Sequence, residues 1–219
     1  MAFTYFFRDI HTLEQVVRHM VPWTSGHSRV RIWDAGCAMG QEAYSLAILL
    51  AENMGRFAFR NICIDATDID TSNLFGAIIS EGIYSENELK RMPQQLFKKY
   101  FQPSYYDDTG QVSLPQSLPP GLAGKPPSFK VVDCIRKRVS YQKHDLLSFQ
   151  PIGDGFSLIL CKNVLLHFQY EERVEVIKMF HRSLSPGGFF ATEQTQKLPR
   201  EVTGLFEQVT GDAQLFRKV

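Results

Sequence analysis

The sequence lacks a marked excess of either charge. It has 24 Lys and Arg residues against 23 Asp and Glu residues, which gives a net charge of +1. A near-neutral protein has no strong general attraction for polyanions, so we do not expect nucleic acid as a partner. The chain also lacks an apolar run of membrane-spanning length and a signal-like N-terminal segment. We therefore expect a cytoplasmic protein that is not embedded in a membrane.

Cysteine is scarce, and its spacing points to no metal. The cysteines contain no Cys-x-x-Cys pair, so we expect reduced thiols and no metal site; they are Cys37, Cys63, Cys134 and Cys161. The rest of the composition is ordinary, with 44% apolar and 21% charged residues. A chain of 219 residues with this composition is predicted to form a single domain, residues 1–219.

Residues 31–50 form the stretch around which the chain is organised. They are predicted to form a buried strand that ends at Asp34, a turn with two glycines, and a helix with apolar residues on one face. Gly36 and Gly40 allow backbone conformations that a Cβ would forbid, so a ligand can come close. Strand, glycine turn and helix in this order open a nucleotide-binding α/β unit. We predict a ligand at this turn, facing free backbone N–H groups of the helix start.

The acidic side chains near the turn indicate which kind of ligand binds there. A dinucleotide site requires Gly-x-Gly-x-x-Gly, whereas here Gly-x-x-x-Gly is followed by Gln41 and Glu42. A carboxylate at a helix start repels a pyrophosphate and attracts a cation. Asp68 ends the next apolar run, where it can accept both hydroxyls of a ribose. S-adenosylmethionine (SAM) has a ribose, an ammonium and a sulfonium but no phosphate. The alternative is an ordinary strand-turn-helix without a cofactor.

Strands and helices alternate along the rest of the chain. Residues 1–26 contain an aromatic segment that ends at Arg8 and a helix from its N-cap Asp9 to Met20. Alternation of this kind predicts a mostly parallel sheet with helices on both faces. The tail, residues 213–219, suits a closing edge strand.

Residues 102–143 differ in amino-acid composition from the segments around them. Prolines and glycines crowd together in residues 115–127, which excludes a helix or a central strand there. We predict an exposed loop within a small inserted β-segment. The basic triplet 136–138 lies in the same segment, and it is either an ordinary solvated face or a surface for an acidic partner.

With these motifs in order, the sequence resembles the CheR family of chemotaxis receptor methyltransferases. The resemblance rests on Phe6-Phe7-Arg8, the glycine turn, Thr67-Asp68-Ile69-Asp70 and Cys161-Lys162-Asn163-Val164. It implies a class I, Rossmann-like SAM-dependent methyltransferase that forms glutamate methyl esters on the cytoplasmic helices of chemoreceptors, with S-adenosylhomocysteine (SAH) as product. The family normally also has an N-terminal helical domain, which these residues do not include, and a β-subdomain, to which residues 102–143 correspond.

The resemblance also implies the site residues. The positions that match the family's cofactor contacts are Thr4, Arg8, Ala35, Gly36, Gln41, Glu42, Asp68, Ile69, Asp145, Leu146, Asn163 and Val164. Arg8 matches the family's essential arginine, and His167 stands where the family has a tyrosine near the methyl-transfer site. Lys162 replaces an arginine, and Ala191-Thr-Glu-Gln replaces Gly-His-Ser-Glu.

Methyl transfer to a glutamate needs positioning more than proton transfer. A glutamate with a pKa of about 4.3 is already ionised at neutral pH, so no general base is required. Arg8 is the expected clamp, because a guanidinium can hold a carboxylate through two parallel hydrogen bonds. His167 is either a hydrogen-bond partner of that carboxylate or an ordinary histidine. The other histidines, His144 among them, show no ligand spacing and are expected to be surface or packing residues. Asp34 is expected to orient the turn or Asn163. Two alternatives stay open: a different methyl acceptor, or an inactive cofactor-binding module in a signalling complex.

Overall fold

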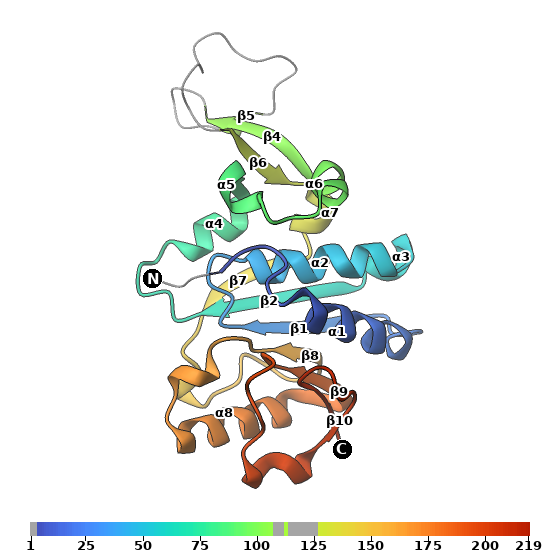
Figure 1. Cartoon of the computed structure of the whole chain (residues 1–219), viewed down its shortest axis with the longest axis vertical. Coiled ribbons are helices and arrows are strands. Elements are labelled where there is room, and N and C mark those ends of the chain that lie inside the picture. Colours follow the sequence, from blue (N-terminus) through green and yellow to red (C-terminus); the bar gives the residue numbers. More distant parts are fainter. Residues whose placement is uncertain (1–3, 107–111, 114–126) are drawn as a thin grey trace.

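A seven-stranded sheet forms the centre of the molecule. The computed structural model describes residues 4–106, 112–113 and 127–219. Within them the strands of this sheet are β1 Val30–Ala35, β2 Ile62–Asp68, β7 Val139–Lys143, β8 Phe156–Leu160, β9 Leu184–Ala191, β10 Phe206–Gln208 and β11 Leu215–Lys218. Their order is β10-β11-β9-β8-β1-β2-β7 (Figure 1). Five strands, β9-β8-β1-β2-β7, pair in parallel, and only the pairs of β11 with β9 and β10 are antiparallel. The predicted mostly parallel α/β fold is confirmed.

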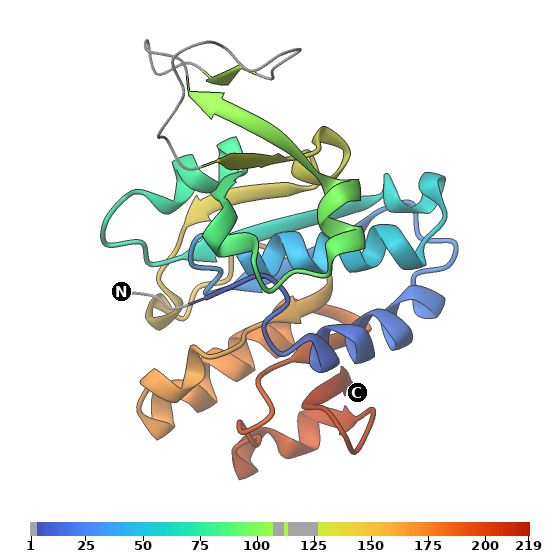
Figure 2. The same cartoon turned by 45° about the horizontal axis from the view of Figure 1, so that its top comes forward.

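Helices cover both faces of this sheet (Figure 2). Ile32 packs into a core with α1 and α2, and its strand neighbour Trp33 packs into a second core with α8, because successive side chains of a strand point to opposite faces. All five residues of β8 are buried, as expected for a central parallel strand. The helices are α1 Ile10–Trp23, α2 Gln41–Asn53, α3 Arg56–Phe59, α4 Phe75–Glu81, α5 Glu86–Leu89, α6 Gln94–Tyr100, α7 Asp133–Arg136 and α8 Tyr170–Ser183, with short 3₁₀ turns η1 Leu146–Ser148, η2 Leu165–His167 and η3 Arg200–Leu205. None of the described helices has the length and apolar character needed to cross a membrane.

A second, smaller sheet stands at one end of the molecule (top of Figure 1). Its order is β3-β6-β4-β5, formed by Ile83–Ser85, Ser128–Val131, Phe101–Tyr106 and Val112–Ser113. The expected insertion, residues 102–143, therefore differs from the observed sheet at both ends. The small sheet already includes β3, whereas β7 joins the main sheet because its residues pair in parallel with β2.

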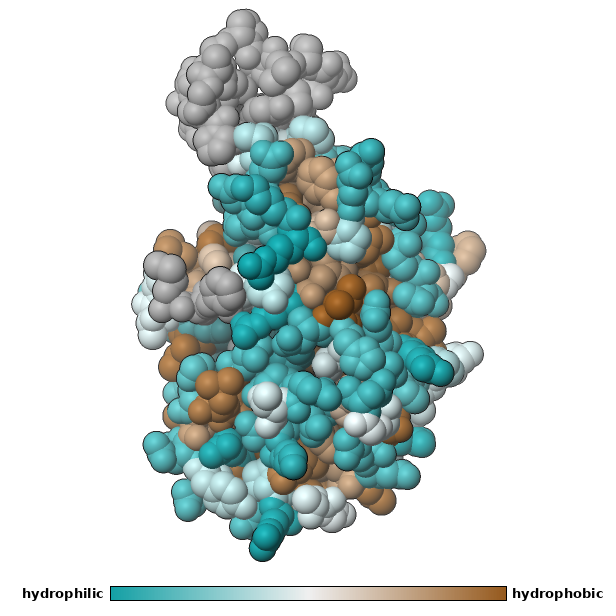
Figure 3. All heavy atoms as spheres, viewed as in Figure 1, coloured by the Kyte–Doolittle hydropathy of each residue, from teal (hydrophilic) through white to brown (hydrophobic). Residues whose placement is uncertain are grey.

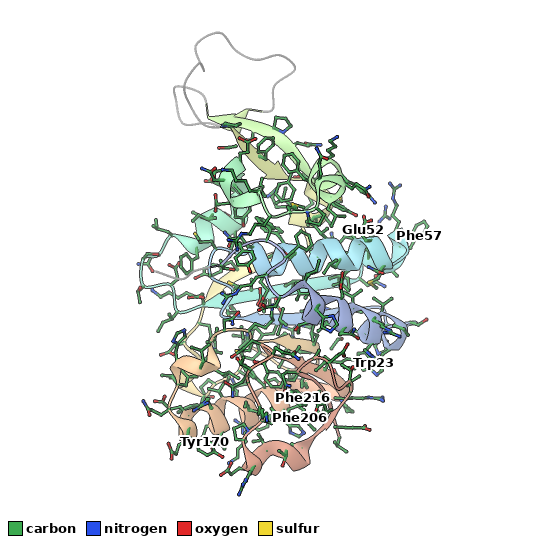
Figure 4. All side chains as sticks on the ribbon, viewed as in Figure 1. Trp23, Glu52, Phe57, Tyr170, Phe206 and Phe216 are labelled. Carbon is green, nitrogen blue, oxygen red and sulfur yellow. The ribbon has the colours of Figure 1, made fainter. Side chains whose placement is uncertain are left out.

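Aromatic and polar contacts join the small sheet to the main part. Phe6 contacts the rings of Tyr84 and Phe101 edge-on, with centroids 4.9 and 5.4 Å away. Glu52, labelled in Figure 4, accepts hydrogen bonds from Lys99 at 2.6 Å and from Tyr100. On the face drawn in Figure 3, apolar surface gathers where the two parts meet. The N-terminal aromatic segment is thus held between the two parts of the fold.

Three expectations need correction or fall outside the described residues. Helix α1 continues to Trp23, and Asp9 precedes it in a left-handed conformation without a side-chain cap. Strand β11 is not at the edge, because β10 pairs with it on the outer side. Phe3 and most of the proline-rich stretch, residues 115–126, lie outside the described residues.

Candidate active site

A cavity of about 580 Å³ lies at the carboxyl ends of the parallel strands. These ends meet at the left of the sheet in Figure 1, on the side of the molecule where Tyr170 is labelled in Figure 4. The chain leaves β1 with β2 on one side and β8 on the other, so the strand order reverses there. Ligands of open α/β sheets bind outside the carboxyl ends at such a reversal. The cavity is lined by Arg8, Gly36, Ala38, Asp68, Ile69, His144, Asp145, Leu146, Leu147, Lys162, Asn163, Val164, Leu166, His167 and Phe168.

The glycine turn forms one wall of the cavity. Gly36 has φ +92°, and a Cβ on it would lie 2.2 Å from Val164 Cγ2, so only glycine fits. The backbone N–H groups of Gly36 and Cys37 donate to the Thr67 carbonyl, at 2.7 and 2.9 Å. The N–H of Ala38 donates to Asp68 Oδ2 at 2.9 Å. These three turn amides thus fasten the turn to the end of β2.

Asp68 ends β2, and Asp145 follows the neighbouring strand β7; both line the cavity. Besides the Ala38 bond, Asp68 accepts the N–H of Asp70 through Oδ1 at 3.1 Å, which orients its carboxylate. Asp145 accepts the N–H of Leu147 at 2.9 Å and begins η1, which carries Leu146 and Leu147. Ile69 is half exposed beside Asp68. This wall therefore offers a fixed carboxylate next to a flat apolar surface.

Asn163 sits at the end of β8 in a conformation that few residues adopt. Its φ is +59°, a left-handed value that costs a non-glycine residue about 1–3 kcal/mol. Glu193, buried after β9, accepts the N–H of Asn163 at 2.8 Å and the hydroxyl of Thr192 at 2.8 Å. The carboxylate of Glu193 thus holds Asn163 at the cavity wall, a part that was expected of Asp34.

Arg8 reaches the cavity from the N-terminal segment. The residues on both sides of it, Phe7 and Asp9, have φ values of +60° and +51°. The N–H of Phe7 donates to Ser45 Oγ at 2.8 Å, and the Arg8 carbonyl accepts from Lys162 Nζ at 3.0 Å. Arg8 is therefore presented on a strained turn that is tied to α2 and to the end of β8.

A charged cluster lies beneath this turn. Lys162, whose side chain is fully buried, forms an ion pair with Glu42 at 2.9 Å and lies 3.7 Å from Asp9 Oδ2. Asp34 is also fully buried, and neither of its carboxylate oxygens has a hydrogen-bond partner in the described part of the chain. Burial, reinforced by the nearby Glu42 carboxylate, raises the pKa of Asp34 well above its usual range. The environment of Asp34 therefore favours its protonated form, while Glu42 and Asp9 carry the carboxylates that face the Lys162 ammonium.

Two histidines lie at the cavity. His167 is exposed on η2, between the exposed Leu166 and the half-buried Phe168. His144 follows β7, and its N–H donates to the Asp68 carbonyl at 2.9 Å. Burial lowers the pKa of the His144 side chain, so the imidazole is neutral at physiological pH. His144 was expected to be a surface or packing residue, and its place in the wall is new.

The structure brings most of the predicted site residues to one place. The predicted residues that line the cavity are Arg8, Gly36, Asp68, Ile69, Asp145, Leu146, Asn163, Val164 and His167. Thr4, Ala35, Gln41 and Glu42 are not among the lining residues. Gln41 is buried, and its amide contacts Glu88 at 3.3 Å. Lys162, Ala38, His144 and Glu193 were missed as site residues. Lys162 could have been predicted from the sequence, because it is adjacent to the predicted site residue Asn163.

The comparison with protein families agrees with this geometry. The family model described as "CheR methyltransferase, SAM binding domain" matches residues 2–215. The chain belongs to this family. The resemblance, the class I fold and SAM as the cofactor are thereby confirmed.

Curated relatives of this CheR-family chain are longer than it is. It is 29% identical over 203 residues to "Chemotaxis protein methyltransferase 2" of Vibrio cholerae serotype O1. This alignment covers 90% of this chain and 62% of that protein. It is 30% identical over 209 residues to "Chemotaxis protein methyltransferase 1" of Pseudomonas aeruginosa, covering 90% of this chain and 67% of that protein. It is also 28% identical over 211 residues to the "Probable chemotaxis protein methyltransferase" of Rhizobium etli, and this alignment covers 94% of this chain and 72% of that protein.

The basic triplet of this CheR-family chain does not lie at the cavity. Residues 136–138 precede β7, so they are at the amino end of that strand, whereas the cavity is at its carboxyl end. The Arg136 guanidinium pairs with Asp133 at 2.9 Å, and that of Arg138 donates to the Arg60 carbonyl at 2.6 Å. The triplet is therefore remote from the cavity and its guanidinium groups are bonded within the fold, and its role as a surface for an acidic partner stays a prediction.

We expect Asp34→Asn to stabilise the CheR-family chain, and more so at high pH. The pKa of Asp34 is raised in the folded state, so between its unfolded and folded values the native protein binds more protons than the unfolded chain. Stability is therefore lost as pH rises through that window, and asparagine removes this loss. A gain of about 1 kcal/mol corresponds to a Tm increase of about 2–4 °C in a chain of this size.

Thermal unfolding between pH 5 and 8 measures this effect. Asp154→Asn, which changes an exposed aspartate, is the control and should leave the Tm unchanged at every pH. A Tm difference for Asp34→Asn that does not depend on pH would show that Asp34 is ionised in the fold.

Proposed function

We propose that this chain is a SAM-dependent protein-glutamate O-methyltransferase that modifies the cytoplasmic helices of chemoreceptors. The observation that carries the proposal is the meeting of Arg8, Asp68 and Asn163 in one cavity at the reversal of strand order. These residues come from the N-terminal segment, β2 and the end of β8. A class I fold alone is compatible with many acceptors, whereas a guanidinium at the cavity favours an anionic one.

The cavity walls fit SAM. Asp68 is proposed to accept the ribose hydroxyls, because each of its oxygens has a lone pair beyond the backbone bonds it already accepts. Ile69 and Leu146 offer apolar surface for the adenine, and Asn163 and Val164 are proposed to face the methionine part. Bound there, SAM supplies an electrophilic methyl group on a sulfonium. Glu42, at the start of α2, is proposed to favour the ligand's ammonium with its carboxylate.

Arg8 is proposed to hold the acceptor glutamate. A carboxylate that is already ionised needs no base, and the neutral His144 in the wall is not required to take a proton. Two parallel bonds from the guanidinium leave a carboxylate lone pair free and fix its direction. His167, at the exposed side of the cavity, is proposed to donate a further hydrogen bond to the same carboxylate. The apolar rim around it, including Leu166, excludes water from the acceptor group.

The partner and the location follow from the same proposal. The relatives carry the name chemotaxis protein methyltransferase, and the chain spans 62% of the Vibrio cholerae relative's length. We place the protein in the cytoplasm, where the signalling helices of chemoreceptors lie.

Methyl transfer from SAM carrying a tritiated methyl group tests the proposed function. With a purified cytoplasmic fragment of a chemoreceptor we expect label that mild base releases as methanol, because an ester hydrolyses under conditions that leave N-methyl groups intact. A fragment with glutamine at the acceptor positions is the matched control and should stay unlabelled. Base-stable label would point to a different acceptor, and SAH binding without any label would favour an inactive cofactor-binding module.

A further inference from the structure

The turn that presents Arg8 cannot hold its shape by local preference. Phe7 and Asp9 have left-handed φ values of +60° and +51°, which residues with a Cβ rarely adopt. The local backbone contributes a long hydrogen bond from the Arg8 N–H to the Tyr5 carbonyl at 3.3 Å, and the Asp9 carbonyl accepts the Thr12 N–H at 3.0 Å. Backbone strain of this kind persists only where the surrounding structure holds it.

Two tethers come from elements far away in the sequence. Ser45 Oγ, on α2, accepts the Phe7 N–H at 2.8 Å and donates to the Gln41 carbonyl at 2.6 Å. Lys162 Nζ, at the end of β8, donates to the Arg8 carbonyl at 3.0 Å, 154 residues away in the sequence. The lysine tether therefore acts on a residue that lines the cavity.

The charge of Lys162 is balanced where it lies. Its side chain is fully buried, and an unpaired ammonium there would be costly. Glu42 compensates it at 2.9 Å, and Asp9, the residue after Arg8, lies 3.7 Å away. The same ammonium thus connects α2, the end of β8 and the C-terminal side of the Arg8 turn. We propose that Lys162 is a positioning residue, whose ammonium holds the strained turn and so aims the Arg8 guanidinium into the cavity; its catalytic consequence rests on the proposed function.

Amide hydrogen exchange tests the tether without any need for activity. Lys162→Met keeps the length of the side chain and removes the ammonium. The N–H groups of Phe7 and Arg8 are expected to exchange at least about tenfold faster in this variant, because a charge-assisted bond no longer opposes local opening. Exchange in β1 is expected to stay as in the wild type. Unchanged protection of residues 7 and 8 would overturn the proposal.

A double variant covers the case in which Lys162→Met fails to fold. Removing only the lysine leaves Glu42 buried without its cation, which is strongly destabilising, whereas removing both charges is often tolerated. Glu42→Gln/Lys162→Met should therefore fold and show the same faster exchange at residues 7 and 8. Protection equal to that of the wild type in the double variant would also contradict the proposal.

Lys218 offers a matched control. Its Nζ likewise donates to backbone carbonyls, those of His181 and Leu184, at 2.7 Å each, and so ties β11 to the end of α8 away from the cavity. Lys218→Met is expected to lower the Tm but to leave both the exchange of residues 7 and 8 and methyl transfer unchanged. An equal loss of methyl transfer in both lysine variants would mean that Lys162 acts through overall stability only, which would refute a positioning role.

The kinetic test separates positioning from cofactor binding. Lys162→Met is expected to lower kcat by about 100-fold, since a misplaced clamp costs that much, while SAH affinity changes by less than about threefold. Ser45→Ala removes the other tether without changing a charge and should lower kcat in the same direction. If Ser45→Ala alters neither kcat nor exchange, the turn does not set the rate and the inference is wrong. If the wild type methylates no acceptor, the proposed function fails, and the exchange experiment still decides the role of Lys162.

Discussion

Arg8→Ala is expected to lose methyl transfer by at least about 100-fold while it binds SAH nearly as the wild type does. The reason is that the proposed partner of the guanidinium is the acceptor carboxylate, and the walls that fit the ribose and adenine come from β2 and from the segment after β7. Arg8→Lys keeps the charge but cannot form two parallel bonds, so we expect it to recover only a small part of the activity. Initial rates with a receptor fragment, together with calorimetry of SAH, measure both effects.

Arg18→Ala is the control for the Arg8 variants. Arg18 is an exposed arginine on α1, so its removal changes the net charge by the same amount without touching the cavity. Full turnover is expected from this variant. An Arg8→Ala protein that still methylates glutamate at the wild-type rate would remove the arginine from the proposed mechanism.

Asp68→Ala is expected to weaken the binding of SAM and SAH by about 100-fold or more. Two hydrogen bonds from ribose hydroxyls to a charged carboxylate contribute about 1.5–3 kcal/mol each before competition with water. The structure adds a second reason, because Asp68 Oδ2 also accepts the Ala38 N–H at 2.9 Å and so shapes the glycine turn. Isothermal titration calorimetry with SAH measures the loss directly.

Asp65, which lies on β2 like Asp68, provides a matched control for the Asp68→Ala variant. Asp65 pairs with Arg31 at 2.9 Å and does not line the cavity. Asp65→Ala therefore removes a carboxylate from β2 without removing a cavity contact, and its SAH affinity should equal that of the wild type. Equal affinities for all three proteins would contradict the ribose role of Asp68.

Local pattern was sufficient for the strands, the glycine turn and the acids that follow the strands. The turn at Gly36 and the carboxylate at Asp68 each lie at the end of a short apolar run, and parallel strands bring their carboxyl ends to one edge. The alternation of strands and helices predicted a mostly parallel sheet, whereas the order of its strands came from the structure. The exact ends of the small sheet did not follow, because β7 resembles the strands of the insertion in sequence but pairs with β2.

The side-chain partners inside the site were beyond the reach of sequence patterns. Asp34 was expected to orient the turn or Asn163, but the carboxylate that contacts Asn163 is that of Glu193, 30 residues further along the chain. His144 was expected to be an ordinary histidine, yet it belongs to the cavity wall. Which of several acids meets a given backbone N–H depends on how two loops pack, and periodicity carries no information on that packing.

The sequence by itself determined the family, the α/β fold, the cofactor and most of the residues around the cavity, because these depend on local motifs and on the direction of parallel strands. The tertiary structure decided the state of the charges and the shape of the turn at Arg8. Burial raises the pKa of Asp34, and Lys162, 154 residues away in the sequence, donates a hydrogen bond to the Arg8 carbonyl. Burial and long-range contact arise only when distant segments pack together, so no stretch of the sequence taken alone contains them.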